Sequence, residues 1–590
     1  MELEPAACTC DVLLVHCESF YDIEYTFCNL GLLYIATYLR EQGYAVKVLA
    51  PSDTYLFDLD DLRRIVTSFR PALAGFYTHA DNLHEVGRMA GRVRSWNPST
   101  RTVVGGPMAT ALGAKLLESP AYDFLISGEG EIPMARLAGV VVRGQGRLDE
   151  VPSLTYRDGD AIRTNPRAPF IEDLDELPAP DRSFVPDLLR LYMAAGRGCP
   201  YGCTFCFVSV HGGRYRSHSP GRVIAELAHN LERYGNVKAV HFIDDTFVAN
   251  PKRVREICRL IREYRERTGR DFIMYCEGRV NILAKNPWLL EELKSAGLTR
   301  LQIGIESGSA EILTHYRKNI ELDDLRRVVG MVRDLGGVCI FGNFIIGGPF
   351  ERSETFEASL DLMRELHRDA PGVFEATSSF LAPYPGTEIH RNPEHFGLVV
   401  CDPEFLTTTA FNDAHCRTDA FSLAEVRLLK RRFDRAIVEA LEANLPGVPR
   451  QTLMNHFVWA YRYNTPTQLY SRVLSQRPAL RNYYLYLTSG RFAVLEDISP
   501  EQLGDMVPFR TVGPPQYDSG GSNFHLRGGV RPMAIRDPLD KQIYAFSCGK
   551  LTVEEIADRI SPNGREDFVR GRMVPLYRKL ARDYQIVFYR

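Results

Sequence analysis

The sequence of 590 residues lacks an apolar run long enough to cross a membrane, which takes about 18 residues or more. It also lacks a strong charge of either sign, because 71 Lys and Arg stand against 74 Asp and Glu, a formal net charge of −3. A large basic surface for nucleic acid is therefore not expected. The first residues include Glu2 and Glu4 and no basic stretch before an apolar one, so no signal peptide is predicted. These absences predict a cytoplasmic protein without a membrane or nucleic-acid partner.

The sequence also lacks the even number of cysteines that is typical of exported, disulfide-bonded proteins. The chain has 13 cysteines and no predicted export signal, which argues against a disulfide framework. Most of them are scattered singly and are expected to be small buried residues. The hydrophobic fraction of 45% and the charged fraction of 25% are those of an ordinary globular protein. At this length, about three to five domains are expected.

Residues 1–150 alternate short apolar strands with helices. This alternation predicts an α/β domain with a doubly wound, Rossmann-like parallel sheet. The strands are expected at 11–15, 44–49, 73–77, 102–107 and 122–126. Ligands of such sheets bind at the carboxyl ends of the strands. Glycines lie at two of these ends, Gly105 and Gly106 in the last part of the fourth strand and Gly128 and Gly130 after the fifth, where they let the backbone approach a bulky ligand.

The rest of the chain divides into three further parts. Residues 151–190 are rich in Pro, Asp and Arg and are predicted to be a connector. Residues 191–400 again alternate strands and helices, which predicts a partial barrel of six βα units. Residues 401–590 are expected to be mostly helical, with a small module from about 530. In that module, Thr552 and Glu555 have the spacing of a capping box.

The strongest chemical signal is Gly198-Cys199-Pro-Tyr-Gly-Cys203-Thr-Phe-Cys206, directly after the first predicted barrel strand. Three thiolates in one short loop can ligate three irons of a 4Fe–4S cluster and leave the fourth iron open. Zinc is the alternative, since His211 and His218 lie nearby. Structural zinc, however, usually takes four closed ligands, commonly as two pairs.

This spacing, with Phe205 before the last cysteine, resembles the radical S-adenosylmethionine (SAM) superfamily, and the resemblance extends over about 191–390. In that family the open iron chelates the amino and carboxylate groups of SAM, and reduction of the cluster cleaves SAM to a 5′-deoxyadenosyl radical. The resemblance implies SAM contacts from the cysteine loop and from segments that follow the later strands, namely Phe205, Asp244, Glu277, Arg279, Glu306, Ser307 and Asn343. Glu306 could accept from the ribose or ammonium of SAM, and Arg279 could meet its carboxylate. Ion pairs at the barrel mouth are the alternative interpretation of these charges.

The first region resembles the cobalamin-binding domain of the cobalamin-dependent branch of that superfamily, on residues 29–36, 104–107 and 127–131. The resemblance implies cobalamin contacts at Thr78, His79, Gly105, Gly106, Pro107, Ser127, Gly128 and Glu129. The Asp-x-His-x-x-Gly motif of many cobalamin domains is absent, so the tail base is expected to lie off the cobalt. His79 could approach the lower face of the cobalamin. Thr78, Asp81 and Asn82 are similarly placed, and the sequence does not choose among them.

The two resemblances together imply a C-methyltransferase. One SAM would methylate cobalamin, and a second would give the radical that takes a hydrogen atom from the substrate, a natural-product intermediate or a peptide. The alternative keeps the cofactors and changes the reaction to a ring contraction, cyclisation or other rearrangement. An electron donor of the flavodoxin or ferredoxin type is implied. No catalytic acid or base is selected, although methylation of an aromatic carbon would need a base, for which Glu277 and Tyr316 are candidates.

Two other classes remain possible from the sequence. A methylthiotransferase-like enzyme would need three more thiols in the first domain. Cys8, Cys10, Cys17 and Cys28 are present, but they fall within the first 28 residues rather than throughout that domain. A sensor built on cobalamin or on the cluster is the non-enzymatic alternative. The final module would bind a peptide or protein substrate, or it would be a lid that supports the barrel.

Overall fold

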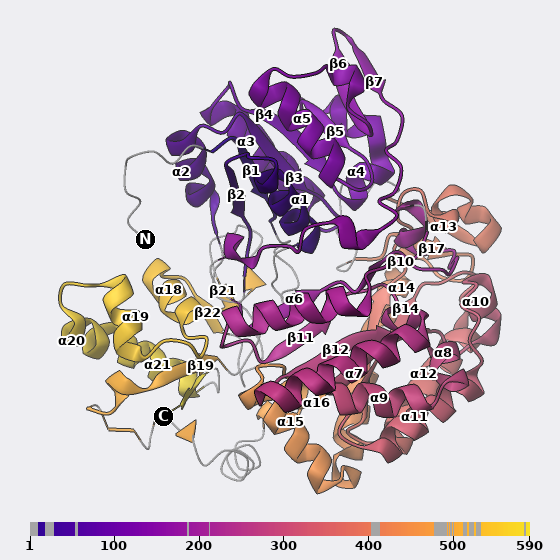
Figure 1. Ribbon diagram of the computed structural model, residues 1–590. Helices are drawn as coiled ribbons and strands as arrows, with labels where there is room; N and C mark the ends of the chain where they lie inside the picture. Colours follow the sequence, from indigo (N-terminus) through magenta and orange to yellow (C-terminus); the bar gives the residue numbers. More distant parts are fainter. Residues whose placement is uncertain are drawn as a thin grey trace.

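The computed structural model describes most of the chain, and all structural statements below refer to these residues (Figure 1). The described residues are 10–17, 29–52, 57–185, 188–211, 213–402, 413–476, 492–493, 495, 498–499, 501–510, 516–517, 524–526, 533–582 and 586–589. Within them, no helix combines the length and the apolar character needed to cross a membrane.

The first sheet confirms the doubly wound α/β fold. Its strand order is β2-β1-β3-β4-β5-β6-β7, and β1 to β5 are parallel. These five strands are β1 (Val12–Val15), β2 (Val46–Leu49), β3 (Leu73–Tyr77), β4 (Arg101–Gly105) and β5 (Phe124–Ile126). The chain runs from β1 outward to β2 and then back to β3 on the other side. The carboxyl ends of β1 and β3 therefore flank the crevice where such sheets bind ligands.

Helices cover both faces of this sheet, because each strand contributes apolar residues alternately to two cores. Leu13, Val15 and Phe76 pack with α2 (Leu59–Phe69) and α3 (Leu83–Trp96) on one face. Leu14 and Val103 pack with α1 (Leu30–Glu41) and α5 (Glu131–Arg143) on the other. Cys10 and Cys17 belong to the first of these cores, whereas Cys8 and Cys28 lie outside the described residues.

The expected connector at 151–190 needs a correction, because the first sheet continues into it. Strands β6 (Leu154–Asp158) and β7 (Ala161–Thr164) form an antiparallel hairpin on β5. Further along, Leu174, Leu177 and Val185 are buried in the same core as the barrel. Leu30, Leu33 and Tyr34 of α1 also belong to that core. The two large domains therefore share one hydrophobic core, which holds them in a fixed relation.

The second sheet confirms the partial barrel. Its order is β15-β14-β13-β12-β11-β8, and every neighbouring pair is parallel. The strands are β8 (Arg190–Met193), β11 (Ala239–Phe242), β12 (Ile273–Gly278), β13 (Leu298–Glu306), β14 (Cys339–Ile346) and β15 (Phe374–Phe380). The helices outside them are α6 (Pro220–Arg233), α7 (Pro251–Thr268), α9 (Trp288–Ala296), α11 (Leu322–Leu335) and α12 (Ser353–Asp369).

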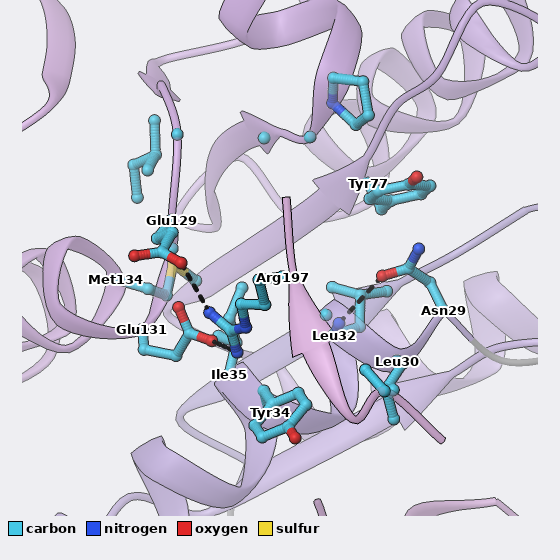
Figure 2. A pocket seen from close by; sticks show the side chains of 18 of the residues that line it. Asn29, Leu30, Leu32, Tyr34, Ile35, Tyr77, Glu129, Glu131, Met134 and Arg197 are labelled. Atoms are coloured by element: carbon cyan, nitrogen blue, oxygen red, sulfur yellow. Dashed lines mark hydrogen bonds and ion pairs between the residues drawn. The ribbon is translucent and has the colours of Figure 1, made fainter. Parts of the chain in front are cut away.

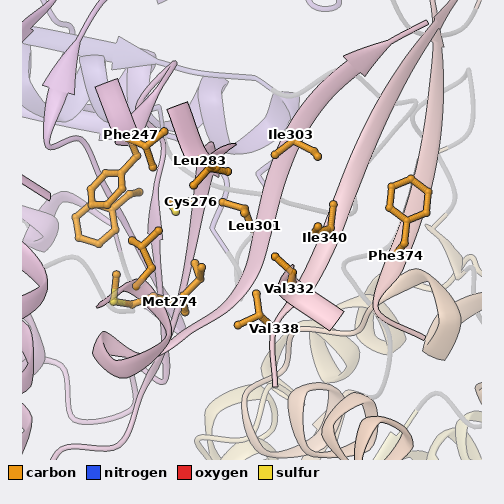
Figure 3. Packing of buried hydrophobic residues seen from close by; sticks show 14 of the residues in the cluster. Phe247, Met274, Cys276, Leu283, Leu301, Ile303, Val332, Val338, Ile340 and Phe374 are labelled. Carbon is orange, nitrogen blue, oxygen red and sulfur yellow. The ribbon is translucent and has the colours of Figure 1, made fainter. Parts of the chain in front are cut away.

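Residues alternate between the two faces of these strands. One face carries apolar residues that are fully buried under the helices, among them Met274, Leu301, Ile303 and Ile340 (Figure 3). The other face carries polar and aromatic residues that are only half-buried, although they lie inside the barrel: Tyr275, Glu277, Gln302, Phe341, Asn343 and Thr377. The inner face of the barrel, whose interior is called the lumen below, is therefore lined by polar and aromatic side chains.

The amino-terminal end of the barrel is covered by the C-terminal region. Trp459 of α15 (Arg450–Arg462) and Tyr463 after it pack with Ala239, Ile273 and Cys339, near the starts of three strands. Below β15, the Glu375 carboxylate accepts hydrogen bonds from the backbone N–H groups of residues 468 and 469 at the start of α16 (Gln468–Arg472). This cover forms a floor under the lumen.

A separate module occupies the end of the chain, shown in yellow in Figure 1. It contains α18 (Pro538–Phe546), α19 (Val553–Ile560), α20 (Arg565–Phe568) and α21 (Val574–Arg582) around a core of its own. The expected capping box is present, because Thr552 and Glu555 exchange hydrogen bonds at the start of α19. The region also contains two small three-stranded sheets that the sequence analysis did not predict.

Candidate functional site

The three clustered cysteines lie in the loop after β8, at the carboxyl end of the barrel. Gly198 begins this loop with φ +78°, and a Cβ there would collide with the carbonyl oxygen of Arg214. Cys199 and Cys203 are buried and Cys206 is partly buried. Burial raises the pKa of the Cys206 thiol to about 12, and Cys203 and Cys199 contribute to this rise. The three thiols are therefore near one another, and metal binding would have to remove their protons.

The groups around these thiols fit an anionic cluster. The Thr246 hydroxyl lies 3.3 Å from the Cys199 sulfur, and the Arg279 guanidinium lies 3.8 Å from the Cys203 sulfur. Arg279 also stacks on the Tyr201 ring, with its Cζ 3.7 Å from the ring centroid. Hydroxyl and guanidinium donors beside sulfur stabilise negative charge on a cluster. The residues present therefore fit a 4Fe–4S cluster.

The zinc alternative finds no support at His218. Its Nε2 lies 3.2 Å from the Tyr34 hydroxyl and its Nδ1 lies 2.9 Å from Asp175. No group of three His, Cys, Asp or Glu side chains in the described part of the chain is arranged to hold a single metal ion. A 4Fe–4S cluster differs from such a site, because its thiolates bind separate irons. The side chain of His211 lies outside what the structure describes.

The residues expected to contact SAM divide into two groups. Arg279, Glu306, Glu277 and Asn343 lie on the inner side of the barrel or at its mouth. Asp244 instead accepts a 2.9 Å hydrogen bond from the Ala195 backbone N–H, and burial raises its pKa to about 7. It therefore fastens the end of β8 just before the cysteine loop.

Two further expected residues also have protein partners. The Ser307 hydroxyl is fully buried and lies 3.1 Å from the Ser359 hydroxyl of α12, on the helix side of the sheet. The Phe205 ring packs against Tyr316, with 4.8 Å between ring centroids. The side chains of Ser307 and Phe205 therefore contact other residues that surround the site. Whether any of the expected residues contacts SAM remains a prediction.

Glu277 is held by a chain of hydrogen bonds inside the lumen. The Tyr275 hydroxyl donates to the Gln302 side-chain oxygen, and the Gln302 amide donates to Glu277 at 3.1 Å. Burial, together with Asp245, raises the pKa of Glu277 to about 8. Tyr316, the other candidate base, is fully buried in an apolar cluster with Ile312 and Ile345. Of the two, Glu277 lies on the inner face of the barrel and Tyr316 in an apolar cluster, and a role as a base stays a prediction for either.

Lys318 belongs to this site, although the sequence analysis did not select it. Its Nζ lies 2.5 Å from the Glu306 carboxylate, and the two side chains are 10% and 7% exposed. Gly304 provides the space, because a Cβ there would collide with both partners. The Lys318 carbonyl accepts a hydrogen bond from Arg279, which joins this ion pair to the cluster loop. No motif signals such a lysine, because it comes from a loop rather than a strand end.

Replacing Lys318 with methionine is expected to destabilise the protein by about 3 kcal/mol, because it leaves the Glu306 carboxylate as an uncompensated buried charge. Urea unfolding under anaerobic conditions measures this change. A Lys318→Met/Glu306→Gln double variant should recover most of the loss. A double variant as unstable as the single variant would show that the ion pair is not the cause.

The second candidate site is a cavity of about 450 Å³ between the carboxyl edge of the first sheet and the barrel. Gly105, Gly106, Pro107, Gly128 and Glu129 line it, as the sequence analysis expected. Asn29, Tyr34, Ile35, Tyr77 and Met134 also line it and were not among the expected contacts, although 29–36 is one of the segments that carry the resemblance (Figure 2). From the barrel side, the cavity is lined by Ala194, Arg197, Gly198, Ile243 and Asp245. The cavity therefore extends from the predicted cobalamin loops to the cluster loop.

The lining of this cavity fits a large cofactor with apolar faces. Gly106 has φ +101°, and a Cβ there would lie 2.6 Å from the Thr78 carbonyl oxygen, so the tight approach of these loops requires glycine. A Cβ on Gly128 would meet no atom within 4 Å. The small residues thus leave open space at the strand ends, where doubly wound sheets bind ligands.

Three residues expected to contact cobalamin are absent from the lining of this cavity: Thr78, His79 and Ser127. Asn82 holds the loop after β3, since its side chain accepts from the His79 backbone N–H and donates to the Cys17 carbonyl. The His79 ring lies beside Asp81, with Nδ1 3.4 Å from its carboxylate. Ser127 lines a smaller neighbouring cavity instead. Contacts of these three residues with cobalamin therefore stay predictions, and the lining of the cavity does not support them.

Glu129 lines the cavity but directs its carboxylate toward the barrel. Both of its oxygens accept hydrogen bonds, from Arg197 at 3.0 Å, from Arg216 at 2.9 and 3.1 Å and from the Ile171 backbone N–H at 3.0 Å. Burial alone would raise its pKa, but Arg216, Ile171 and Arg197 together hold that pKa below its ordinary value. Glu129 is therefore an ionised group that joins the two domains.

Comparison with known proteins assigns both domains. A profile of the B12 binding domain matches residues 21–138, and a profile of the radical SAM superfamily matches residues 193–363. An uncharacterized methyltransferase of Pyrococcus horikoshii is 31% identical over 373 residues, which cover 61% of this chain and 77% of that relative. The hopanoid C-3 methylase of Methylococcus capsulatus is 28% identical over 371 residues, 61% of this chain and 67% of that relative. An anaerobic magnesium-protoporphyrin IX monomethyl ester cyclase of Rubrivivax gelatinosus is 25% identical over 374 residues, 61% and 65% of the two chains.

Solved structures show the same fold. The radical SAM methyltransferase TsrM from Kitasatospora setae, solved with cobalamin and a [4Fe-4S] cluster, aligns with a TM-score of 0.60 at 16% identity, over 81% of this chain and 99% of that chain. The cobalamin-dependent SAM radical enzyme OxsB aligns with a TM-score of 0.59 at 16% identity, over 81% and 72%. At such low identity the likeness concerns the fold alone. The two profiles confirm the expected cofactors: a 4Fe–4S cluster, SAM and cobalamin.

Proposed function

Because the chain belongs to the cobalamin-dependent radical SAM enzymes, we propose that it is a C-methyltransferase, which moves a methyl group from SAM by way of cobalamin to a carbon of its substrate. The observation that carries the proposal is the cavity between the domains. Its wall includes Gly105 and Gly128 on one side and Gly198 and Asp245 on the other. A methyl carrier held in this cavity would have residues of the cluster loop in its wall.

When bound, the cofactors would supply a methyl group, taken by reduced cobalamin from one SAM that leaves as S-adenosylhomocysteine, and a radical, formed with methionine when the reduced cluster gives one electron to a second SAM. The radical would remove a hydrogen atom from the substrate carbon that then receives the methyl group. The protein itself holds the cofactors and shields the reacting groups from water. Cys199, Cys203 and Cys206 would hold the cluster. The floor formed by Trp459 and Tyr463 closes the far end of the lumen, which limits the access of water to the reacting groups.

The lumen supports a substrate with hydrogen-bonding groups. Its half-buried wall includes Tyr275, Glu277, Gln302 and Asn343, and the first three form one hydrogen-bonded chain. A purely hydrocarbon substrate would bury the hydrogen-bonding capacity of this wall that the chain does not itself satisfy, such as the second N–H of the Gln302 amide, and this costs free energy. We propose a polar natural-product intermediate or a peptide as the substrate, with a low-potential electron donor of the flavodoxin or ferredoxin type.

A rearrangement, ring contraction or cyclisation is the second candidate. It is favoured by one observation, that the relatives include a cyclase as well as methylases. These reactions need the same cofactors but no transfer of the methyl group from SAM. The two candidates therefore differ in the fate of that methyl group.

Methyl-labelled SAM distinguishes the two candidates without knowledge of the substrate. The reconstituted enzyme is reduced anaerobically with labelled SAM, and the cobalamin is then extracted and analysed by mass spectrometry. The proposed function predicts labelled methyl on the cobalamin and an equal amount of S-adenosylhomocysteine. Unlabelled cobalamin together with 5′-deoxyadenosine would favour the rearrangement.

A further inference from the structure

We propose that Arg197 is a positioning residue that couples the two cofactor sites, so that cobalamin binds more tightly when the cluster is in place, and the cluster more tightly when cobalamin is bound. The inference rests on the two cofactor assignments and not on the methyl-transfer reaction.

On the barrel side, Arg197 belongs to the backbone of the cluster loop. It precedes Gly198 and Cys199 and ends strand β9 (Gly196–Arg197). This strand pairs with β10 (Arg216–Ser217), which sets Arg197 opposite Arg216. The first cluster ligand is thus two residues from Arg197. A displacement of the Arg197 backbone would move that ligand.

On the cobalamin side, Arg197 bridges two carboxylates of one loop. Its Nη1 lies 3.0 Å from Glu129 and its Nη2 lies 2.7 Å from Glu131 (Figure 2). These two residues flank Gly130 at the start of α5, and all three line the cavity. One guanidinium therefore fixes both ends of the loop that the cofactor would touch.

A third contact fixes the plane of the guanidinium. The Arg197 Cζ lies 4.7 Å from the centroid of the Tyr34 ring, and Tyr34 comes from α1 and lines the same cavity. The Tyr34 hydroxyl is in turn 3.2 Å from His218. A planar, five-donor group suits such a bridge, whereas a lysine can place only one ammonium between the carboxylates. The geometry of this bridge therefore requires an arginine rather than a lysine.

Burial makes this bridge costly to break. The Arg197 side chain is 19% exposed and that of Glu131 is 4% exposed. Charged pairs in such surroundings are screened little by solvent, and removal of one partner leaves the other buried without compensation. A shift of the loop that carries Glu129 and Glu131, or a shift of the cluster loop, would each disturb the same bridge. This shared dependence couples the two sites.

The chain offers a matched control in Arg40. This residue of α1 also pairs across the boundary of the first domain, with 2.5 Å between its Nη2 and Asp181, and it also lies over an aromatic ring, that of Phe184, at 4.7 Å. Arg40 does not line the cavity between the domains. Its removal therefore tests for a general effect of weakening the contact between the first domain and the connector.

The experiment measures the dissociation constant of hydroxocobalamin by anaerobic spectrophotometric titration, with and without a reconstituted cluster. In the unaltered protein the cluster is expected to tighten binding by about 5- to 100-fold, a usual size for coupling between sites. In Arg197→Gln this ratio should fall to about one, and in Arg197→Lys it should be intermediate. Arg40→Gln should keep the ratio of the unaltered protein.

Two results would overturn the proposal: a ratio of one in the unaltered protein, or an unchanged ratio in Arg197→Gln. Circular dichroism and iron content establish whether Arg197→Gln folds. If it does not fold, Glu131→Gln replaces it, since this change removes one carboxylate of the bridge and keeps Arg197 paired with Glu129. A ratio in Glu131→Gln equal to that of the unaltered protein would then contradict the proposal.

Discussion

Replacing Cys203 with alanine is expected to lower the iron content of the reconstituted protein from about four atoms per chain to less than about one, because two remaining thiolates do not hold an open-site cluster. SAM cleavage should fall by about 1000-fold or more, because the cluster that delivers the electron is lost. A fall of 1000-fold corresponds to a rise of about 4 kcal/mol in the activation free energy. Cys203 is the most telling of the three thiols, because it is buried and Arg279 lies against its sulfur. Iron and sulfide assays and the yield of 5′-deoxyadenosine measure the two effects.

Cys401 gives the matched control for this change. It is exposed and lies outside the loop of clustered thiols. Cys401→Ala should keep both the iron content and SAM cleavage. A Cys203→Ala protein that keeps four irons and full SAM cleavage would show that this loop does not hold the cluster.

Replacing Gly105 with leucine is expected to weaken cobalamin binding by about 100-fold, on the order of 3 kcal/mol, because the added side chain occupies space that the cofactor needs. Gly105 ends β4 and lines the cavity, and a Cβ there would meet only the Ile126 carbonyl, at 3.8 Å. The backbone therefore accepts a side chain at this position without strain. Titration with hydroxocobalamin measures the loss, while the iron content should stay unchanged.

Gly91→Leu is the control for this substitution. Gly91 lies on the exposed side of α3 in the same domain, and a Cβ there would meet no atom within 4 Å. It does not line the cavity. Unweakened cobalamin binding in Gly105→Leu would place the cofactor elsewhere, whereas equal weakening in both variants would indicate a general loss of stability.

The sequence predicted the parallel strands well because their apolar runs are short and are separated by amphipathic helices. The expected strand at 73–77 agrees with β3 (Leu73–Tyr77), and the order of the barrel strands follows directly from their order in the chain. The hairpin of β6 and β7 was missed because only part of it is buried. The burial of β7 is low throughout, so its sequence shows no apolar pattern. A stretch of this kind cannot be distinguished from a linker by composition.

The sequence indicated which loops form the candidate sites, but it did not indicate which side chains contact one another there. The cysteine spacing located the cluster loop, because short-range spacing is a property of sequence. Glu129 was expected to contact cobalamin and it lines the cavity, yet its partners Arg197 and Arg216 lie 68 and 87 residues away. No local pattern could reveal those pairs. The same reason applies to Lys318, whose role depends on the space left by Gly304 on a neighbouring strand.

Iron, sulfide and cobalt per chain, measured together after anaerobic purification from a cobalamin-fed host, test most directly the claim that one chain holds both cofactors side by side. We expect about four irons, four sulfides and one cobalt per chain. Four irons without cobalt, even after incubation with hydroxocobalamin, would contradict it. The barrel would then stand alone, and the first domain would have no methyl group to deliver.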